Sequence, residues 1–401
     1  MSNRYLEISL SNKTSDNKMS FREGVSDLIF QVPAMNSTLL PASVRVCGKL
    51  RIYKSGTGNS KVLVASTDSL AINSRLGVYG AFESLTTRSI KHQQTIENIR
   101  HYGHMLKTYL PLSTKLENNI GHLNEVGLTM PNWNLNKASI VDKVSADNTG
   151  DSFCIPLPCG LFNGTGDIPL ADTGLGGLEI KLQLAPDSQF LFANDGETAG
   201  LTDAWYEFDD LKLICEVQDY DTQQKAQGAF TYQSISSYYD TINSNQAQIN
   251  FNLGLSKVRS VWASFVPSTF LNSYGNDGYA TLMPSNKSTG YLADIKKVVW
   301  TRGGSLYPKH MELNNIIRDA PTTSSIDPVI LRDYVSAVLP FVKNHSTMIS
   351  PTNISRNYVA SKINTKQPSY MRIGEGGEIY GLGMTYDALG GSGADFSQSS
   401  F

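Results

Sequence analysis

The chain is poor in charge, in cysteine and in long apolar runs. Only 17% of its 401 residues are charged, and the formal net charge is −2. Such a balance gives no overall electrostatic attraction to nucleic acid or to an anionic membrane. The sequence has no run of about 18 apolar residues, so it predicts no membrane-spanning helix. It also has no apolar stretch at the N-terminus, so we expect no signal peptide.

Cysteine is scarce, and all four cysteines lie in the first half of the chain, at Cys47, Cys154, Cys159 and Cys215. Cys215 lies on the apolar phase of its predicted strand, where a buried, reduced thiol is the usual state. A chain of this length builds a hydrophobic core without disulfide bonds. We therefore expect a reducing compartment.

Nucleotide-binding and hydrolase motifs are missing. No Walker sequence occurs, and the glycines within 174–177 precede a predicted strand rather than a helix, which favours a tight turn over a phosphate site. No Gly-x-Ser-x-Gly elbow is present, and the Gly-Gly-Ser-Gly run at 390–393 lies in the C-terminal tail. We therefore expect no enzyme activity, no catalytic residue and no cofactor.

A metal site has one weak candidate. His101 and His104 are three residues apart, and Cys154 and Cys159 could join them. The spacing of the two cysteines does not fit a zinc knuckle, and the prolines between them stiffen the segment. We expect two surface or loop histidines and no metal.

An acidic cluster is formed by Glu207, Asp209 and Asp210. A glycosidase needs two carboxylates across a cleft, and calcium sites gather oxygen ligands in this manner. A solvated strand edge is the favoured interpretation. Three tryptophans could line a sugar-binding groove, but core packing is favoured for those in apolar strands; they are Trp205, Trp262 and Trp300.

A short basic strip is formed by Arg45, Lys49 and Arg51, which share one face of a predicted strand, with Lys54 just beyond. It could face nucleic acid, but an ordinary solvated sheet face is favoured because the net charge is nearly neutral.

Alternating strands are what the sequence does contain. Leucine and isoleucine occupy every second position of 178–184, with polar residues between them, and 211–217 repeats this period of two. Side chains of a strand point alternately to its two faces, so both segments predict half-buried strands of an antiparallel β-sandwich. Further strands are predicted at 25–32, 44–52, 61–65, 76–82, 152–162, 230–238, 247–253, 258–266, 295–301, 357–363 and 379–386.

Two helices interrupt this pattern. Apolar residues recur at three- and four-residue spacing over 93–109, which predicts an amphipathic helix. The second runs from the cap Asp327 to Pro340. The glycines at 303–304 predict a turn that follows the 295–301 strand.

The order of these elements predicts two sandwiches in one chain. We expect an N-terminal arm at 1–21, a first sandwich at 22–217 and a polar linker at 218–228. A second sandwich would occupy 229–386, and the Gly- and Ser-rich tail at 387–401 would be mobile.

Two local runs resemble the double jelly-roll major capsid proteins of the adenovirus and tectivirus lineage. The runs are 72–106, and 176–192 with 206–217, and both are most similar to polinton-like viruses and virophages; the second half, including 299–308, agrees in layout. The resemblance implies an all-β fold of two tandem eight-stranded jelly-roll sandwiches, each with a short inserted helix. It also implies trimeric, pseudo-hexameric capsomers that tile an icosahedral shell.

The partners that the resemblance implies are other copies of the chain, neighbouring capsomers, and penton and minor capsid proteins, without sequence-specific nucleic acid. Membrane contact stays open. One alternative is a carbohydrate-binding tandem β-sandwich, such as a lectin or virion attachment protein. The other is a β-sandwich glycoside hydrolase.

Overall fold

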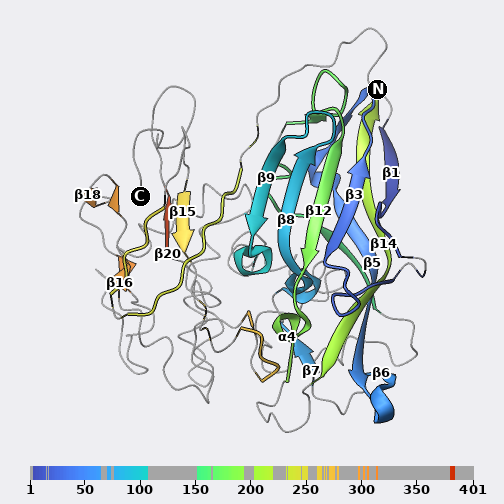
Figure 1. Ribbon diagram of the computed structural model, residues 1–401. Helices are drawn as coiled ribbons and strands as arrows, with labels where there is room; N and C mark the ends of the chain where they lie inside the picture. Colours follow the sequence, from blue (N-terminus) through green and yellow to red (C-terminus); the bar gives the residue numbers. More distant parts are fainter. Residues whose placement is uncertain are drawn as a thin grey trace, which may run out of the picture. The chain divides into compact units, whose positions relative to one another are not determined.

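The computed structural model describes residues 3–106 and 151–219 nearly throughout, and shorter parts of the rest (Figure 1). Within these two ranges it leaves out 15, 17, 65–69, 74–75, 164–165 and 194–202. Beyond them it describes 232, 234–244, 246–251, 260–263, 266, 268, 271–275, 278–279, 297–298, 301–302, 305–306, 313–314 and 380–383. The predicted helix at 327–340, the strand at 357–363 and the tail at 387–401 lie outside the described residues. No helix within the described part is long and apolar enough to cross a bilayer.

The chain divides into two compact units. The first comprises Met1–Leu106, Asn119–Ser237 and Ser268–Tyr279, and the second comprises Lys107–Asn118, Tyr238–Pro267 and Ala280–Phe401. A segment from beyond the predicted linker, Ser268–Tyr279, is thus part of the first unit.

One sheet of the first unit, sheet A, is built around the long strand β14. The strands β1 and β2 pair with one side of β14, and β4 and β5 pair with the other. The strands β10 and β11 continue the sheet beyond β5 and β4, and β6 forms a hairpin with β5. The bounds are β1 Asn3–Ser9, β2 Lys18–Met19, β4 Ser37–Leu39, β5 Arg45–Ser55, β6 Lys61–Leu63, β10 Asp151–Pro156, β11 Ile168–Pro169 and β14 Ala204–Asp219.

The other sheet, sheet B, has the strand order β3-β12-β8-β9. Its strands are β3 Asp27–Val32, β8 Phe82–Ser89, β9 Thr95–Arg100 and β12 Leu178–Leu184. The unit also contains a small strand pair, β7 and β13, the short α-helix α4 and three 3-10 turns. They are β7 Leu70–Ile72, β13 Leu191–Ala193, α4 Asp187–Phe190, and the 3-10 turns Pro41–Ser43, Thr57–Asn59 and Gly77–Ala81.

The strand order of the first unit is that of a jelly roll. In chain order the strands fill eight positions: β1 with β2, β3, β4 with β5, β8, β9, β10 with β11, β12, and β14. Sheet A then has the order 1-8-3-6 and sheet B the order 2-7-4-5, with every pairing antiparallel. The first position pairs with the eighth, the second with the seventh, the third with the sixth and the fourth with the fifth. This nested pairing makes the sandwich a jelly roll.

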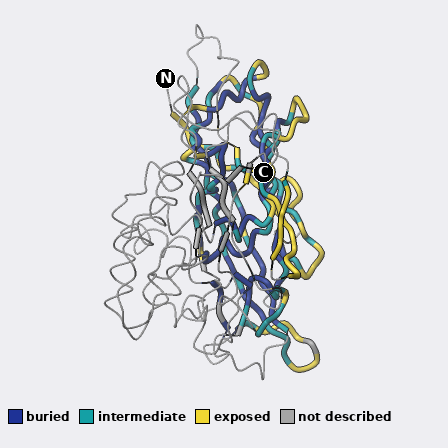
Figure 2. Tube along the Cα trace, turned by 90° about the vertical axis from the view of Figure 1, so that its left-hand side faces the viewer, coloured by how far each residue is buried: buried dark blue, intermediate teal, exposed yellow. Residues whose placement is uncertain are grey.

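The core lies between the two sheets. Leu178, Ile180 and Leu182 of β12 are fully buried, as their period of two predicts. Phe82 of sheet B stacks on Phe208 of sheet A, with ring centroids 5.7 Å apart. Figure 2 shows buried stretches along the strands and exposed ones at the turns. The predicted all-β class is thus confirmed, and the first unit forms one jelly roll.

Five short or medium predicted strands of the first half agree with the structure. The predicted strands 25–32, 61–65 and 178–184 contain β3, β6 and β12, and the predicted strands 44–52 and 152–162 overlap β5 and β10. The sixth position holds β10, which pairs with β5, as expected of an edge strand that contains proline. The predicted strand at 211–217 is part of β14, which begins earlier, at Ala204.

The predicted helix at 93–109 is wrong in its first half. Thr95–Arg100 form the edge strand β9, residues 102–106 are helical, and 107–109 lie outside the described residues. The predicted strand at 76–82 is also wrong, because Gly77–Ala81 form a 3-10 turn and the strand β8 begins at Phe82. The predicted arm at 1–21 contributes β1 and β2 to sheet A.

The described strands of the second unit form short pairs. They are β15 Ser260–Ala263 with β20 Tyr380–Gly383, β16 Lys297–Val298 with β19 Leu313–Asn314, and β17 Thr301–Arg302 with β18 Ser305–Leu306. The last pair flanks the predicted glycine turn at 303–304, and these two residues lie outside the described ones. The predicted strands at 230–238 and 247–253 are not strands where the structure describes them. The second jelly roll itself stays a proposal.

Candidate functional site

The histidine and cysteine candidates do not converge on a metal. His101 follows β9, and its Nδ1 lies 2.6 Å from Oε1 of Glu83. Cys154 lies between two core residues of β10 and therefore points to the outer face of sheet A, whereas Cys159 is fully buried. Within the described ranges, no group of three or more histidine, cysteine or acidic residues could hold a metal ion.

The acidic residues of the cluster on β14 each interact with a different cationic side chain. Glu207 is fully buried and forms an ion pair with Lys61, while Lys18 lies 3.7 Å from its other oxygen. Asp209 pairs with Arg51 at 3.1 Å, and Asp210 has a left-handed backbone (φ 50°) within a strand irregularity. These carboxylates neutralise the charges of Lys and Arg side chains on neighbouring strands. They do not face one another across a cleft.

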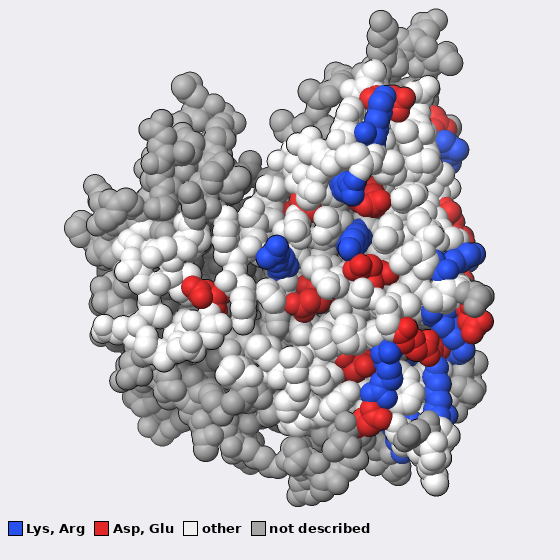
Figure 3. Space-filling model, in the orientation of Figure 1, with Lys and Arg blue, Asp and Glu red and all other residues white. Residues whose placement is uncertain are grey.

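The basic strip lies next to acidic side chains. Arg51 faces Asp209, and Lys49 is in register with the same aspartate. Figure 3 shows Lys and Arg intermingled with Asp and Glu on the face that it draws. Trp205 is nearly buried, stacks on Tyr53 at 5.9 Å and is covered by the Arg22 guanidinium at 4.3 Å. The side chain of Trp262 and the whole of Trp300 lie outside the described residues.

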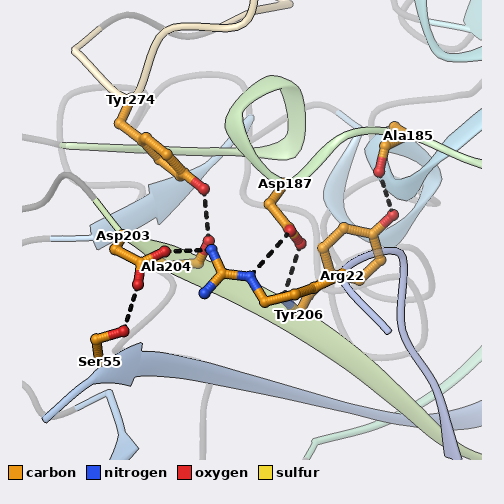
Figure 4. Close-up of polar contacts among 8 residues, drawn as sticks. All are labelled: Arg22, Ser55, Ala185, Asp187, Asp203, Ala204, Tyr206 and Tyr274. Carbon is orange, nitrogen blue, oxygen red and sulfur yellow. Dashed lines mark hydrogen bonds and ion pairs between the residues drawn. The ribbon is translucent and has the colours of Figure 1, made fainter. Parts of the chain in front are cut away.

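A cluster of polar contacts around Arg22, the polar cluster, connects several elements (Figure 4). Its guanidinium forms an ion pair with Asp203 and lies 3.8 Å from Asp187. The Ser55 hydroxyl donates to the other oxygen of Asp203. Hydrogen bonds from Arg22 and Ser55 lower the pKa of Asp203. The polar cluster connects the end of β5, the helix α4 and the start of β14.

The same polar cluster contains a buried acid, Asp187, and two tyrosines. Burial raises the pKa of Asp187 to about 6, although the Tyr206 amide donates to its carboxylate at 3.2 Å. The Tyr206 hydroxyl donates to the Ala185 carbonyl at 2.6 Å, and the Tyr274 hydroxyl donates to the Ala204 carbonyl at 2.7 Å (Figure 4). Tyr274 therefore anchors the downstream segment on the first jelly roll.

A second anchor is Tyr279, which is fully buried. Its hydroxyl donates to the Gly80 carbonyl at 2.7 Å and accepts from the Gln189 amide at 2.9 Å. Its ring lies 4.8 Å from that of His104. His104 thus packs in an aromatic contact rather than in a metal site.

A third anchor is the buried carboxylate of Glu97 on the edge strand β9. It accepts hydrogen bonds from the amides of Gly160 at 3.0 Å, Leu161 at 3.1 Å and Ile235 at 2.6 Å. Burial raises its pKa, and these hydrogen bonds oppose the shift. The segment around Ile235 thereby lies along the edge of sheet B, where the Ser237 hydroxyl also accepts from the Arg100 amide.

The sequence reasoning did not single out Arg22, Asp187, Glu97 or Tyr279. A charged residue inside an alternating or apolar run is the one signal that could have marked Glu97. Nothing in the sequence indicates that Tyr279 packs into the first jelly roll, because its partners lie about 90 or more positions away.

Exposed apolar side chains gather in one irregular segment of the second unit, 238–251. The exposed fractions are 55% for Tyr238, 66% for Tyr239, 42% for Ile242 and 37% for Ile249. Tyr238 stacks on Phe251 at 5.3 Å. Clustered exposed apolar groups of this kind mark contact sites of proteins. We call 238–251 the apolar segment.

No family model and no curated protein sequence matches the chain. Among solved structures, it is similar to the Sputnik virophage structure determined by cryo-EM, with 10% identity, a TM-score of 0.40 and coverage of 65% of this chain and 57% of that one. It is similar to the PBCV-1 virus capsid with 10% identity, a TM-score of 0.49 and coverage of 100% and 82%.

A third similar structure is the Faustovirus major capsid protein, with 8% identity, a TM-score of 0.28 and coverage of 54% of each chain. The chain thus spans little more than half of the Sputnik and Faustovirus chains.

Proposed function

We propose that this chain is a major capsid protein that forms trimeric, pseudo-hexameric capsomers of an icosahedral virion. The observation that carries the proposal is the jelly-roll strand order of the first unit, 1-8-3-6 over 2-7-4-5. Jelly rolls recur in viral capsid proteins because two packed sheets form a rigid block with few free sheet edges. A second block of the same kind in the second half is part of this proposal, and it is supported by the pairing of β15 with β20, which lie within the predicted strands 258–266 and 379–386.

The trimer follows from the two-block plan. Three copies with two blocks each place six blocks around one axis, which approximates a hexagon. Closed cyclic association uses one interface three times, so a single pair of different but complementary surfaces on each chain is sufficient. The apolar segment is our candidate for part of this interface, because its tyrosines and isoleucines are exposed in the single chain. Penton and minor capsid proteins are further proposed partners.

The test is the mass of the purified full-length protein in solution, measured by size-exclusion chromatography with light scattering. At micromolar concentration we expect three times the chain mass of 43.9 kDa, about 132 kDa. Negative-stain images should show blocks with hexagonal outline. A stable monomer under these conditions would contradict the capsid proposal.

A matched pair of variants tests the apolar segment separately. Tyr239→Ser should weaken the trimer, whereas Tyr5→Ser should leave it intact, although Tyr5 on β1 is 74% exposed. A trimer that tolerates Tyr239→Ser contradicts the surface assignment and leaves the capsid proposal standing.

One observation bears on the carbohydrate-binding alternative, because jelly rolls also occur in lectins and exposed aromatic rings stack on sugars. Tyr238 and Tyr239 are such rings. A glycan array probed with the same protein distinguishes the two functions: selective glycan binding by a monomer favours the lectin, and a glycan-independent trimer favours the capsid protein.

A further inference from the structure

Two thiols face each other on the outer side of sheet A. The register of β10 and β5 places Cys154 directly opposite Cys47. The neighbours of Cys154, Phe153 and Ile155, are buried in the core, so the thiols lie on the opposite face, where each is half-buried and free. Directly opposed residues have Cβ atoms about 4.5–5.5 Å apart, close to the roughly 3.5–4.5 Å of a disulfide.

The surrounding charges favour a thiolate at Cys154. The Cys47 thiol donates a hydrogen bond to it, and this contact, followed by the charge and hydrogen bond of Arg45, lowers the pKa of Cys154 to about 6. The same hydrogen bond raises the pKa of Cys47. Lys212 is in register with Cys47 from the other side and forms an ion pair with Glu7 at 2.6 Å. Cys154 therefore has the properties of an attacking thiolate, and Cys47 those of the second thiol.

We propose that Cys47 and Cys154 are a thiol pair that forms a reversible cross-strand disulfide on exposure to a small-molecule disulfide such as oxidised glutathione. The Cys154 thiolate attacks one sulfur of oxidised glutathione, forms a mixed disulfide and releases one glutathione thiolate. Cys47 loses its proton and attacks the Cys154 sulfur, which releases the second glutathione thiolate. Two protein thiols are oxidised, and one molecule of oxidised glutathione is reduced to two of glutathione.

The bond would fix the sixth strand position of the jelly roll to the third. It would close the loop formed by residues 48–153, and long closed loops restrict the unfolded chain most. The strand β10 contacts sheet A through β5, so the bond would hold this strand in place. The inference does not depend on the capsid proposal, because it rests on contacts within the first unit.

The test uses the full-length protein at neutral pH with excess oxidised glutathione, followed by blocking of free thiols and peptide mapping by mass spectrometry without reductant. We expect one cross-linked peptide pair, Cys47 with Cys154. The melting temperature should rise by on the order of 5–10 °C and return after reduction. A folded protein in which both thiols are still blocked as free groups overturns the proposal.

Two variants locate the chemistry. Cys47→Ser should stop at the mixed disulfide of Cys154 with glutathione and show no rise in melting temperature. Cys215→Ala, in the core of β14, should keep the cross-link, because burial raises the pKa of Cys215 and removes it from the reaction. A wild-type protein that accumulates the mixed disulfide at Cys154 while Cys47 stays free also overturns the proposal. The peptide map of the wild-type protein decides the outcome. A variant that fails to fold therefore does not affect the conclusion.

Discussion

Tyr279 donates its hydroxyl to the carbonyl oxygen of Gly80 at 2.7 Å, across 199 positions of sequence. The ring is fully buried in the first unit. A residue from beyond the predicted linker therefore completes the core of the first jelly roll. Tyr274 and Ile235 make similar contacts with backbone groups or buried acids of the first 220 residues. The first unit therefore includes residues that follow the predicted linker.

Removing the Tyr279 hydroxyl should destabilise the first unit. Tyr279→Phe leaves the buried Gly80 carbonyl without this donor and the Gln189 amide without this acceptor. Loss of buried hydrogen-bond partners costs about 1–3 kcal/mol of unfolding free energy. Urea denaturation followed by circular dichroism measures the loss. Tyr232→Phe is the control, because this hydroxyl is at the surface, 3.4 Å from the Ile96 carbonyl, and its loss should change stability by less than about 0.5 kcal/mol.

The Tyr279 ring also explains a glycine in the short helix at 102–106. A Cβ atom on Gly103 would lie 2.7–2.9 Å from three atoms of this tyrosine. Gly103→Ala should gain up to about 1 kcal/mol of helix propensity but lose about 1–3 kcal/mol to overpacking, so a net loss is expected. In a Tyr279→Ala background the clash is gone, and the same change should be neutral or stabilising. Additive effects in this double-mutant cycle would disprove the contact.

Strict alternation was the part of the fold that the sequence predicted well. In β12 every inward residue is apolar and every outward residue is polar, so its limits could be assigned correctly. The strand β9 departs from this alternation, because Glu97 occupies an inward position and is buried. A buried carboxylate breaks the period of two, and the apolar residues that remain have the spacing of a helix. The helix prediction at 93–109 failed for this reason.

The strand β8 was missed for a related reason. Its inward positions include Thr87 and Ser89, which are polar and buried, so the apolar pattern ends soon after Phe82. Arg22 and Tyr279 could not be predicted, because their partners are brought close by the tertiary fold. Sequence patterns report the face of an element that is apolar, and they do not report long-range hydrogen bonds.

Glu97 gives a direct test of the edge of sheet B. Glu97→Gln replaces one carboxylate oxygen by an NH2 group, which cannot accept a hydrogen bond. Either the hydrogen bonds of Gly160 and Ile235 to Oε1 or that of Leu161 to Oε2 is therefore lost. We expect a loss of about 2–3 kcal/mol and faster hydrogen exchange at one or more of these amides. Glu179→Gln on the outer face, 3.9 Å from Arg88, should change stability by less than about 0.5 kcal/mol. Unchanged hydrogen exchange at all three amides would contradict the role of Glu97 as an anchor for these segments.

Asp187 should make the stability of the first unit depend on pH. Burial raises its pKa from 3.8 to about 6, so the folded state binds this proton more tightly than the unfolded chain. Stability from this group is therefore complete below about pH 4 and is lost as pH rises towards and through 6. A shift of this size corresponds to about 3 kcal/mol. Asp187→Asn cannot ionise, so the difference in unfolding free energy, wild type minus variant, should fall by about 2–3 kcal/mol between pH 4 and 7.

Asp203 in the same polar cluster supplies a control, because its pKa is shifted in the opposite direction. Hydrogen bonds from Arg22 and Ser55 lower its pKa, so the folded state holds this proton less tightly than the unfolded chain. Its stabilising contribution is present above the ordinary pKa of an aspartate and is lost as pH falls. The difference between wild type and Asp203→Asn should therefore decrease towards acid, whereas that for Asp187→Asn decreases towards neutral pH. Two parallel, flat profiles in urea titrations from pH 3 to 7 would show that burial of Asp187 does not control its ionisation.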